Sequence, residues 1–100
     1  MARPELLTGE ARETALAELM AAGWVHDPAT DRIARTFRFR DFSAAFGWMT
    51  RVALRAEVLD HHPDWSNSWN RVEVSLTTHD CKGLTELDIA LARAMDALAG

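Results

Sequence analysis

The spacing of apolar residues changes along this chain, and the change limits the folds that the chain can adopt. Three segments repeat apolar residues at the 3.6-residue period of an amphipathic helix. They are residues 8–23, 42–59 and 85–98. Residues 33–40 and 71–79 instead alternate apolar with polar side chains, as half-buried strands do, and residues 24–26 form a shorter strand before a turn at 27–31. The pattern αββα, then one or two strands, then α predicts an α+β fold: an antiparallel sheet of about four strands with three helices packed on one face, in αββαββα order.

Other residues mark the ends and faces of these elements. Thr8 is placed to cap the first helix and Gly23 to end it. Residues 85–88, Thr-Glu-Leu-Asp, match a capping box that opens the last helix. Arg35 interrupts the apolar row of its strand. The stripe expected to face the core from the second helix is Phe42, Ala45, Phe46, Met49, Val52, Ala53 and Ala56.

Length and composition restrict the class of protein. The 100 residues, 48% hydrophobic and 26% charged, suit a single domain spanning residues 1–100 with one core. A net charge of -4 argues against direct binding of nucleic acid, which needs clustered positive charge. The single cysteine, Cys81, cannot form an intramolecular disulfide. With no apolar run near the roughly 18 residues of a membrane helix and no signal-peptide pattern, we expect no membrane association and a cytoplasmic location.

Three of the four histidines fall at the ends of predicted elements, where side chains can reach a cleft. Because Pro63 disfavours helix in the residue before it, His62 should be extended and His61 should lie at or just past the helix end. His79 ends the strand predicted for residues 71–79. Imidazole exchanges protons near neutral pH, so two such groups on opposite sides of a substrate can catalyse a dehydration.

Carboxylates accompany these histidines. Glu57 precedes His61 by four residues and shares its helical face, while Asp60 directly precedes it, so either could orient the imidazole. Simpler interpretations stay open: histidines at 61–62 also suit an ordinary helix C-terminus, and Asp88 suits a plain capping role. Trp65 and Trp69 are interpreted as packing residues, with stacking on a ligand as the alternative.

Two other kinds of chemistry compete with acid/base catalysis. A metal site could use His61, His62, His79 and a carboxylate, since these ligands suit zinc or iron. Adjacent residues in extended chain point to opposite sides, however, and neither HxH nor HxxxH occurs, so no metal site is predicted. A nucleophilic Cys81 has only the nearby His79 in its favour.

The spacing of these residues resembles the signature of the pterin-4a-carbinolamine dehydratase family. The matching positions, with no departure among them, are Glu57, His61-His62-Pro63, Trp69, His79 and Asp88. Residues 41–54 and 77–80 also resemble the family's long helix and its strand-to-loop segment. The resemblance covers nearly the whole chain.

The resemblance implies that the protein is a 4a-hydroxytetrahydrobiopterin dehydratase, a hydro-lyase that forms quinonoid dihydropterin during tetrahydropterin recycling after aromatic amino acid hydroxylation. It implies no cofactor, because the pterin is the substrate. His61 and His79 would be the acid/base pair, and His62, also in the catalytic set, would mainly hold the pterin. The substrate-binding residues implied are Glu57, Asp60, His61, His62, Pro63, Thr77, Thr78, His79, Asp80 and Asp88.

The resemblance also bears on assembly. The family looks tetrameric, a dimer of dimers in which sheets extend across one interface and long helices pack at the other. Trp48, Leu54 and Val58 lie outside the predicted core stripe of the second helix and, with Arg51 and Arg55, give it a mixed outer face. That face also leaves open an alternative function seen in animal members, the dimerisation cofactor (coactivator) of a homeodomain transcription factor.

Overall fold

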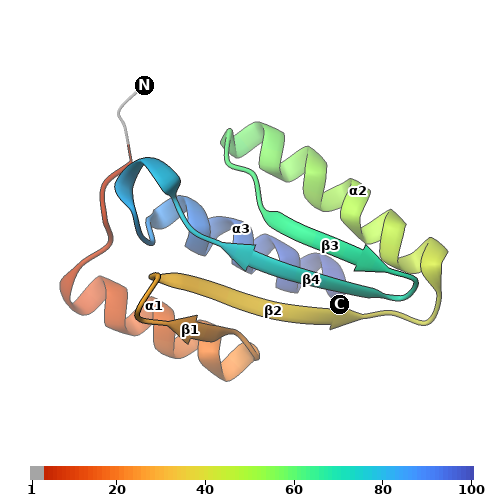
Figure 1. The fold of residues 1–100 in the computed structure, drawn as a ribbon, viewed down its shortest axis with the longest axis horizontal. Coiled ribbons are helices and arrows are strands. Elements are labelled where there is room, and N and C mark those ends of the chain that lie inside the picture. The colour runs from red at the N-terminus through yellow and green to blue at the C-terminus, as the bar shows by residue number, and fades with distance from the viewer. Residues whose placement is uncertain (1–3) are drawn as a thin grey trace.

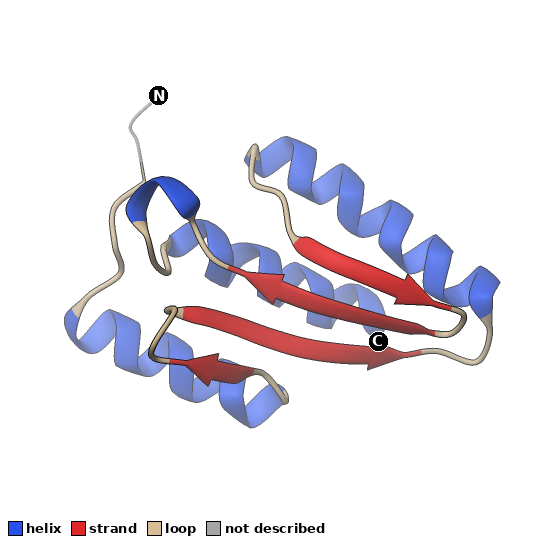
Figure 2. Ribbon diagram, in the orientation of Figure 1, coloured by secondary structure: helices blue, strands red, loops and turns tan. Residues whose placement is uncertain are grey.

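The structure, a computed structural model, describes residues 4–100 as helices on one face of a sheet (Figure 1, Figure 2). In chain order the elements are α1 (Gly9–Ala22), β1 (Val25–Asp27), β2 (Arg32–Arg38), α2 (Phe42–Leu59), β3 (Asp64–Ser68), β4 (Arg71–Leu76), the 3-10 turn η1 (His79–Cys81) and α3 (Glu86–Ala99). The four strands pair antiparallel in the order β1-β2-β4-β3. The predicted α+β class and αββαββα order are therefore confirmed. No helix within residues 4–100 has the length and apolar character needed to cross a bilayer.

The helix boundaries follow the local signals. Gly23, at φ 115°, ends α1 in the left-handed conformation that glycine adopts without steric cost, and its N–H donates to backbone carbonyls of the last turn. At α3 both halves of the capping box form: the Thr85 side chain accepts from the backbone, and the Asp88 side chain accepts from the Thr85 N–H. Thr8 is the N-cap of α1 by position but makes no side-chain cap bond.

Trp48 lies at the centre of the core between the sheet and the helices, so its predicted place on the outer face of α2 is wrong. The side chain is fully buried, its Nε1–H donates to the Met95 carbonyl oxygen at 3.1 Å, and its ring lies 4.5 Å from that of Phe37. Helix α2 packs through Ala45, Trp48, Val52 and Ala56. Phe42 and Phe46 of the predicted stripe are half-exposed, and Ala53 is exposed. The indole fits the core because its polar N–H finds a partner there.

Strand β4 is shorter than predicted. It ends at Leu76, where the strand pattern of the sequence continued to His79. The reason is pairing: the β2 register stops at Ile33↔Leu76 and the β3 register at Asp64↔Ser75, so no neighbouring strand is left for later residues. Thr78 instead exchanges backbone hydrogen bonds with Gly83, which closes a loop around η1.

Strand β3 lies at one edge of the sheet, and its mostly polar residues give little indication of a strand. Trp65 is its one large apolar side chain, half-buried with its ring 6.2 Å from that of Trp48. A two-residue turn joins β3 to β4, with Trp69 at φ 49° and the Asn67 side chain donating to the carbonyls of Trp69 and Arg71. Trp69 is 65% exposed on this turn, so the packing role considered for it is wrong.

Candidate active site

The C-terminal end of α2 turns His61 into the interior of the molecule. Asp60 takes the left-handed conformation at φ 49°, and its N–H donates to the Glu57 carbonyl oxygen at 3.2 Å. The His61 N–H then reaches back to the Ala56 carbonyl oxygen at 3.0 Å, which completes a Schellman-type cap. The chain thereby leaves the helix with His61 only 9% exposed.

A buried hydrogen-bond cluster, formed by His61, Thr78, Thr85 and Asp88, fixes that imidazole. The His61 Nε2 lies 2.6 Å from Asp88 Oδ1. Asp88 Oδ2 accepts from the Thr78 hydroxyl at 2.7 Å and from the Thr85 N–H at 2.9 Å. The side chain of Asp88 is fully buried, so these partners compensate for its lost hydration. The capping role expected for Asp88 is confirmed, and the same carboxylate also contacts His61, which the sequence did not predict.

The bonding pattern assigns the nitrogens of His61. A carboxylate is an acceptor only, so Nε2 carries the hydrogen that Asp88 Oδ1 accepts. In the neutral ring, Nδ1 is then the basic nitrogen, and in the cation both nitrogens donate. The pairing with Asp88 holds the ring in one orientation, so Nδ1 is the atom of His61 that is left to exchange a proton.

A cavity of about 940 Å³ lies beside this cluster. Four parts of the chain wall it: the segment before α1, the end of α2 with the residues after it, the stretch from Thr77 to η1, and the first turn of α3. The lining residues are Pro4, Glu5, Leu6, Leu7, Thr8, Leu59, Asp60, His61, His62, Thr77, Thr78, His79, Asp80, Glu86 and Leu87. All three histidines singled out in the sequence therefore line one cavity.

The other two histidines of the cavity are held more loosely than His61. The side chain of His62 is 58% exposed, with Nε2 3.7 Å from Glu57 Oε1. The side chain of His79 is 75% exposed, with Nε2 3.7 Å from Asp64 Oδ2. Both distances are longer than a hydrogen bond. One imidazole is thus anchored in the interior, while two exposed imidazoles are free to adjust to a ligand.

Only some of the remaining predicted site residues line the cavity. Asp60, Thr77, Thr78 and Asp80 line the cavity with the histidines. Glu57 and Pro63 do not, and Asp88 lies behind His61 in the buried cluster. The predicted set also omitted Thr85, whose hydroxyl lies 2.8 Å from that of Thr78, although the capping box could have indicated it. It omitted the segment before α1 as well, which carries no periodic pattern.

The structure gives little support to the three alternatives considered above: a metal site, a nucleophilic Cys81, and stacking of a ligand on Trp65 or Trp69. Within residues 4–100, no three or more His, Cys, Asp or Glu side chains are grouped so that they could hold a metal ion. The thiol of Cys81 is half-buried, donates to the Pro4 carbonyl oxygen at 3.0 Å and does not line the cavity. Trp65 and Trp69 lie outside the cavity lining, so neither provides a stacking surface there.

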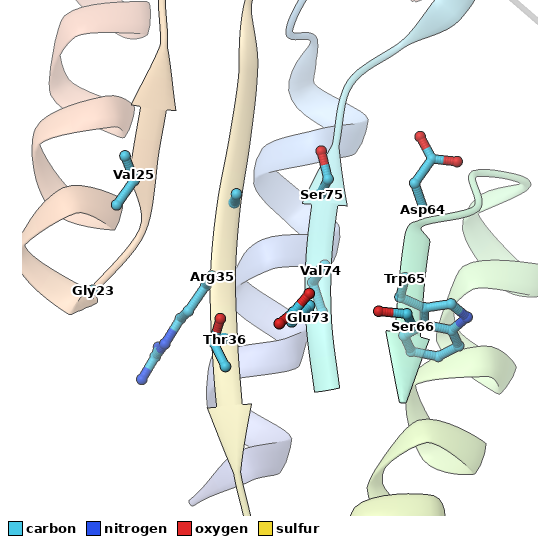
Figure 3. A pocket seen from close by; sticks show the side chains of 11 residues that line it. Gly23, Val25, Arg35, Thr36, Asp64, Trp65, Ser66, Glu73, Val74 and Ser75 are labelled. Carbon is cyan, nitrogen blue, oxygen red and sulfur yellow. The ribbon is translucent and has the colours of Figure 1, made fainter. Parts of the chain in front are cut away.

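Another, shallower cavity lies across the strands of the sheet (Figure 3). Its volume is about 520 Å³, and the side chains around it come from all four strands, with Thr36, Ser66 and Ser75 as hydroxyl groups and Glu73 among the carboxylates. It contains no histidine. Proton transfer near neutral pH is therefore better supported in the histidine-lined cavity.

The fold and site define a small α+β protein with a cavity lined by three histidines. A family model described as "Pterin 4 alpha carbinolamine dehydratase" matches residues 5–98. The chain is 58% identical over 95 residues to a protein of Bradyrhizobium sp. (strain ORS 278) and 57% identical over 95 residues to one of Rhizorhabdus wittichii, both named "Putative pterin-4-alpha-carbinolamine dehydratase". These alignments cover 95% of this chain and 93% and 96% of the relatives. The chain belongs to the pterin-4-alpha-carbinolamine dehydratase family.

Solved structures agree with that assignment. The crystal structure of a transcriptional coactivator/pterin dehydratase from Brucella melitensis superposes with a TM-score of 0.87 at 50% identity, covering 96% of this chain and 100% of that one. A pterin dehydratase-like protein, identified as a RuBisCO assembly factor in the alpha-carboxysome, superposes with a TM-score of 0.68 at 23% identity, covering 78% and 90%. The latter shows a shared fold alone, so function must be argued from the cavity.

Proposed function

We propose that this protein dehydrates 4a-hydroxytetrahydropterin to quinonoid dihydropterin, the step that returns the pterin to recycling after aromatic amino acid hydroxylation in the cytoplasm. The observation that carries the proposal is the meeting of His61, His62 and His79 in one cavity, with His61 fixed by Asp88. Family membership supports the same substrate class.

The reaction asks only for two proton transfers. One group protonates the hydroxyl as the C4a–O bond breaks and water leaves, and another removes the N5 proton as the N5=C4a double bond forms. In the proposal His61 and His79 are this acid/base pair, since they come from different chain segments and face the same cavity. His62 holds the pterin, together with polar groups of Asp60 and Asp80 at the cavity wall.

Thr77 and Thr78 contribute to the cavity differently from Asp60 and Asp80. The Thr77 hydroxyl already donates to the Asp31 carbonyl oxygen at 3.0 Å, and the Thr78 hydroxyl belongs to the Asp88 cluster. Each hydroxyl keeps acceptor capacity, but its hydrogen is engaged. In the proposal the two threonines therefore shape the cavity wall and accept hydrogen bonds from the substrate.

A dehydratase assay on the purified protein tests the proposed function. Wild-type protein should accelerate loss of the 4a-hydroxy species well above a protein-free blank, which must be subtracted because the dehydration also proceeds unaided. A rate no higher than the blank, from protein whose circular dichroism is native, would rule out the proposed activity.

We expect catalysis to need no metal or organic cofactor, because proton transfer between imidazole and substrate completes the reaction. Dialysis against a strong chelator should leave the rate unchanged. Elemental analysis of the same sample should find no stoichiometric metal. Activity lost on chelation and restored by zinc or iron would overturn this expectation and favour the metal site considered above.

We also expect self-association, a dimer of dimers as the family resemblance implies. Helix α2 exposes Phe42 and Phe46, each 49%, Leu54, 65%, and Val58, 82%, while β3 offers an unpaired edge. Burying such side chains stabilises an interface by about 25 cal/mol per Å² of apolar area. Light scattering at micromolar concentration should report a tetramer, or a dimer if one interface is weak. The substitution Val58→Asp should reduce the mass, whereas a monomeric and fully active wild type would contradict the expectation.

A second candidate function is binding of a transcription factor, since the Brucella melitensis protein is named a transcriptional coactivator as well as a pterin dehydratase. Here the exposed side of α2 would bind the partner. The Val58→Asp variant separates the two functions, because Val58 lies outside the cavity lining and its change should leave dehydratase chemistry intact in each subunit. Loss of partner binding with retained turnover would support a separate binding role.

A further inference from the structure

Asp31, at the end of the β1–β2 turn, is the centre of a hydrogen-bond cluster outside the candidate active site. We call this cluster, formed by Asp31 with Arg12, His26 and the Leu84 N–H, the hub. The Asp31 carboxylate accepts from Arg12 at 2.5 and 3.1 Å, from the Leu84 N–H at 3.0 Å, and lies 2.8 Å from His26 Nε2. The side chain is 19% exposed and that of Arg12 is 26% exposed. None of Arg12, His26 and Asp31 lines the cavity.

The hub holds both ends of the segment that carries His79. At its start, the Thr77 hydroxyl donates to the Asp31 carbonyl oxygen at 3.0 Å. At its end, the Leu84 N–H donates to the Asp31 carboxylate. Since Thr78 and Gly83 also pair through their backbones, residues 77–84 form a closed loop that is fastened to Asp31 at its base.

The same hub also fastens the segment 4–8, which lies beside this loop and lines the same cavity. Arg12, besides its bonds to Asp31, donates to the Leu7 carbonyl oxygen at 3.3 Å. The Leu7 N–H in turn donates to the Leu84 carbonyl oxygen at 2.8 Å. The segment 4–8 and the loop 77–84 are thus joined to each other and to one ion pair, and both of them line the cavity.

The ion pair is charged throughout the neutral range. Hydrogen bonds from the Arg12 guanidinium, aided by the Leu84 N–H and His26, hold the pKa of Asp31 well below its usual range although burial opposes this. The pairing also raises the pKa of Arg12. The carboxylate therefore keeps all its lone pairs available to the donors around it.

We propose that Asp31 and Arg12 are positioning residues of the dehydratase: their ion pair holds the loop that carries His79 against the segment 4–8, and so fixes this part of the cavity wall. The inference rests on the proposed function. It concerns residues that never touch the substrate and act through the placement of His79 and of the cavity wall.

The Asp31→Asn variant tests the proposal, with Asp96→Asn as a matched control. Asp96 accepts from Arg35 at 2.5 Å and from the Trp24 indole at 3.0 Å, and the side-chain exposures of that pair, 28% and 22%, are close to those of Arg12 and Asp31. Asp96 does not line the cavity. Both variants lose a half-buried ion pair, so both should unfold at lower urea concentration, but only Asp31→Asn should disturb the site.

The expected result for Asp31→Asn is a kcat/KM about 10- to 100-fold lower per folded molecule, because small misplacements of reacting groups cost rates of this order. A higher KM should accompany a lower kcat. Asp96→Asn should stay within about twofold of wild type, since a purely structural loss lowers only the folded fraction. Equal kinetic constants for the two variants, after correction for that fraction, would overturn the proposal.

The Gly83→Ala variant gives an independent test that keeps every charge. A Cβ at Gly83 would lie 2.5 Å from Asp31 Oδ2 and 2.7 Å from Leu6 Cδ2, closer than such atoms approach, so the contact between the loop, Asp31 and the segment 4–8 has to shift. Kinetics should change in the same direction as in Asp31→Asn, and wild-type kinetics from folded Gly83→Ala protein would contradict the proposal.

Amide hydrogen exchange separates this inference from the proposed function, because it needs no dehydratase activity. Exchange at residues 77–84 should be faster in Asp31→Asn than in wild type and unchanged in Asp96→Asn. If wild type lacks activity but this pattern appears, the proposed function fails while the coupling of Asp31 to the loop stands. Equal rates of amide exchange at residues 77–84 in all three proteins would show that Asp31 does not hold the loop in place.

Discussion

Replacing His61 or His79 with alanine should lower kcat by about two to four orders of magnitude, the range expected when general acid/base catalysis is lost. Each imidazole lines the cavity from a different segment, so neither can take over the proton transfer of the other. The rate is measured in the dehydratase assay after subtraction of the uncatalysed reaction.

His62→Ala is the matched control for His79→Ala, since both side chains are exposed at the same cavity. It should act mainly on KM. His79→Ala should keep native circular dichroism and stability, whereas His61→Ala should also lose stability because it leaves Asp88 Oδ1 without its partner. Turnover within a few-fold of wild type in both His61→Ala and His79→Ala would refute their assignment.

The Asp88→Asn variant should lose about 10²- to 10⁴-fold in kcat, the scale seen when a catalytic histidine is held in the wrong tautomer. An asparagine has one acceptor oxygen, but the cluster needs acceptors on both sides. If the amide oxygen faces Thr85 and Thr78, its NH₂ group meets His61 Nε2, which must then give up its hydrogen. The basic nitrogen of the neutral ring would move from Nδ1 to Nε2, away from its working position.

In the other amide orientation the NH₂ group meets the Thr85 N–H, and that donor is left without an acceptor at a cost of about 1–3 kcal/mol in unfolding free energy. Urea denaturation measures this cost, and ¹⁵N chemical shifts of the His61 ring identify the tautomer. Asp96→Asn is again the control, since it removes a carboxylate from the same helix away from the cavity. Wild-type kcat in Asp88→Asn would show that the orientation of His61 does not matter for catalysis.

Sequence patterns predicted the fold where local signals and tertiary contacts agree. The αββαββα order, the capping box at Thr85 and the turn at Gly23 all depend on neighbouring residues, and the structure contains them. The prediction for Trp48 was wrong because the side of α2 that faces the core is set by contacts with distant residues, here the ring of Phe37 and the carbonyl oxygen of Met95. Strand β3 owes its conformation to pairing with β4, which its own polar residues do not indicate.

The candidate site, like the fold, could be predicted from the sequence only in part. The histidines were found because their residue type suggests chemistry and their spacing resembles a family signature. The segment 4–8 was missed because it takes its place from bonds to distant residues, such as that of Leu7 to Leu84. Asp31 was assigned only to a turn, although its contacts reach residues 19 positions earlier and 53 later. Such roles depend on contacts between segments, which no local pattern encodes.

The double use of Asp88 bears on the order in which the molecule can assemble. One carboxylate both begins α3 and fixes the imidazole at the end of α2, and 27 residues separate the two partners. The first turn of α3 and the end of α2 must therefore dock before His61 acquires its orientation. A partly folded chain with a formed sheet but an undocked α3 would contain every proposed catalytic side chain and still lack the arrangement that makes them work. Recovery of activity on refolding should therefore require docking of α3 on α2 and not the formation of secondary structure alone.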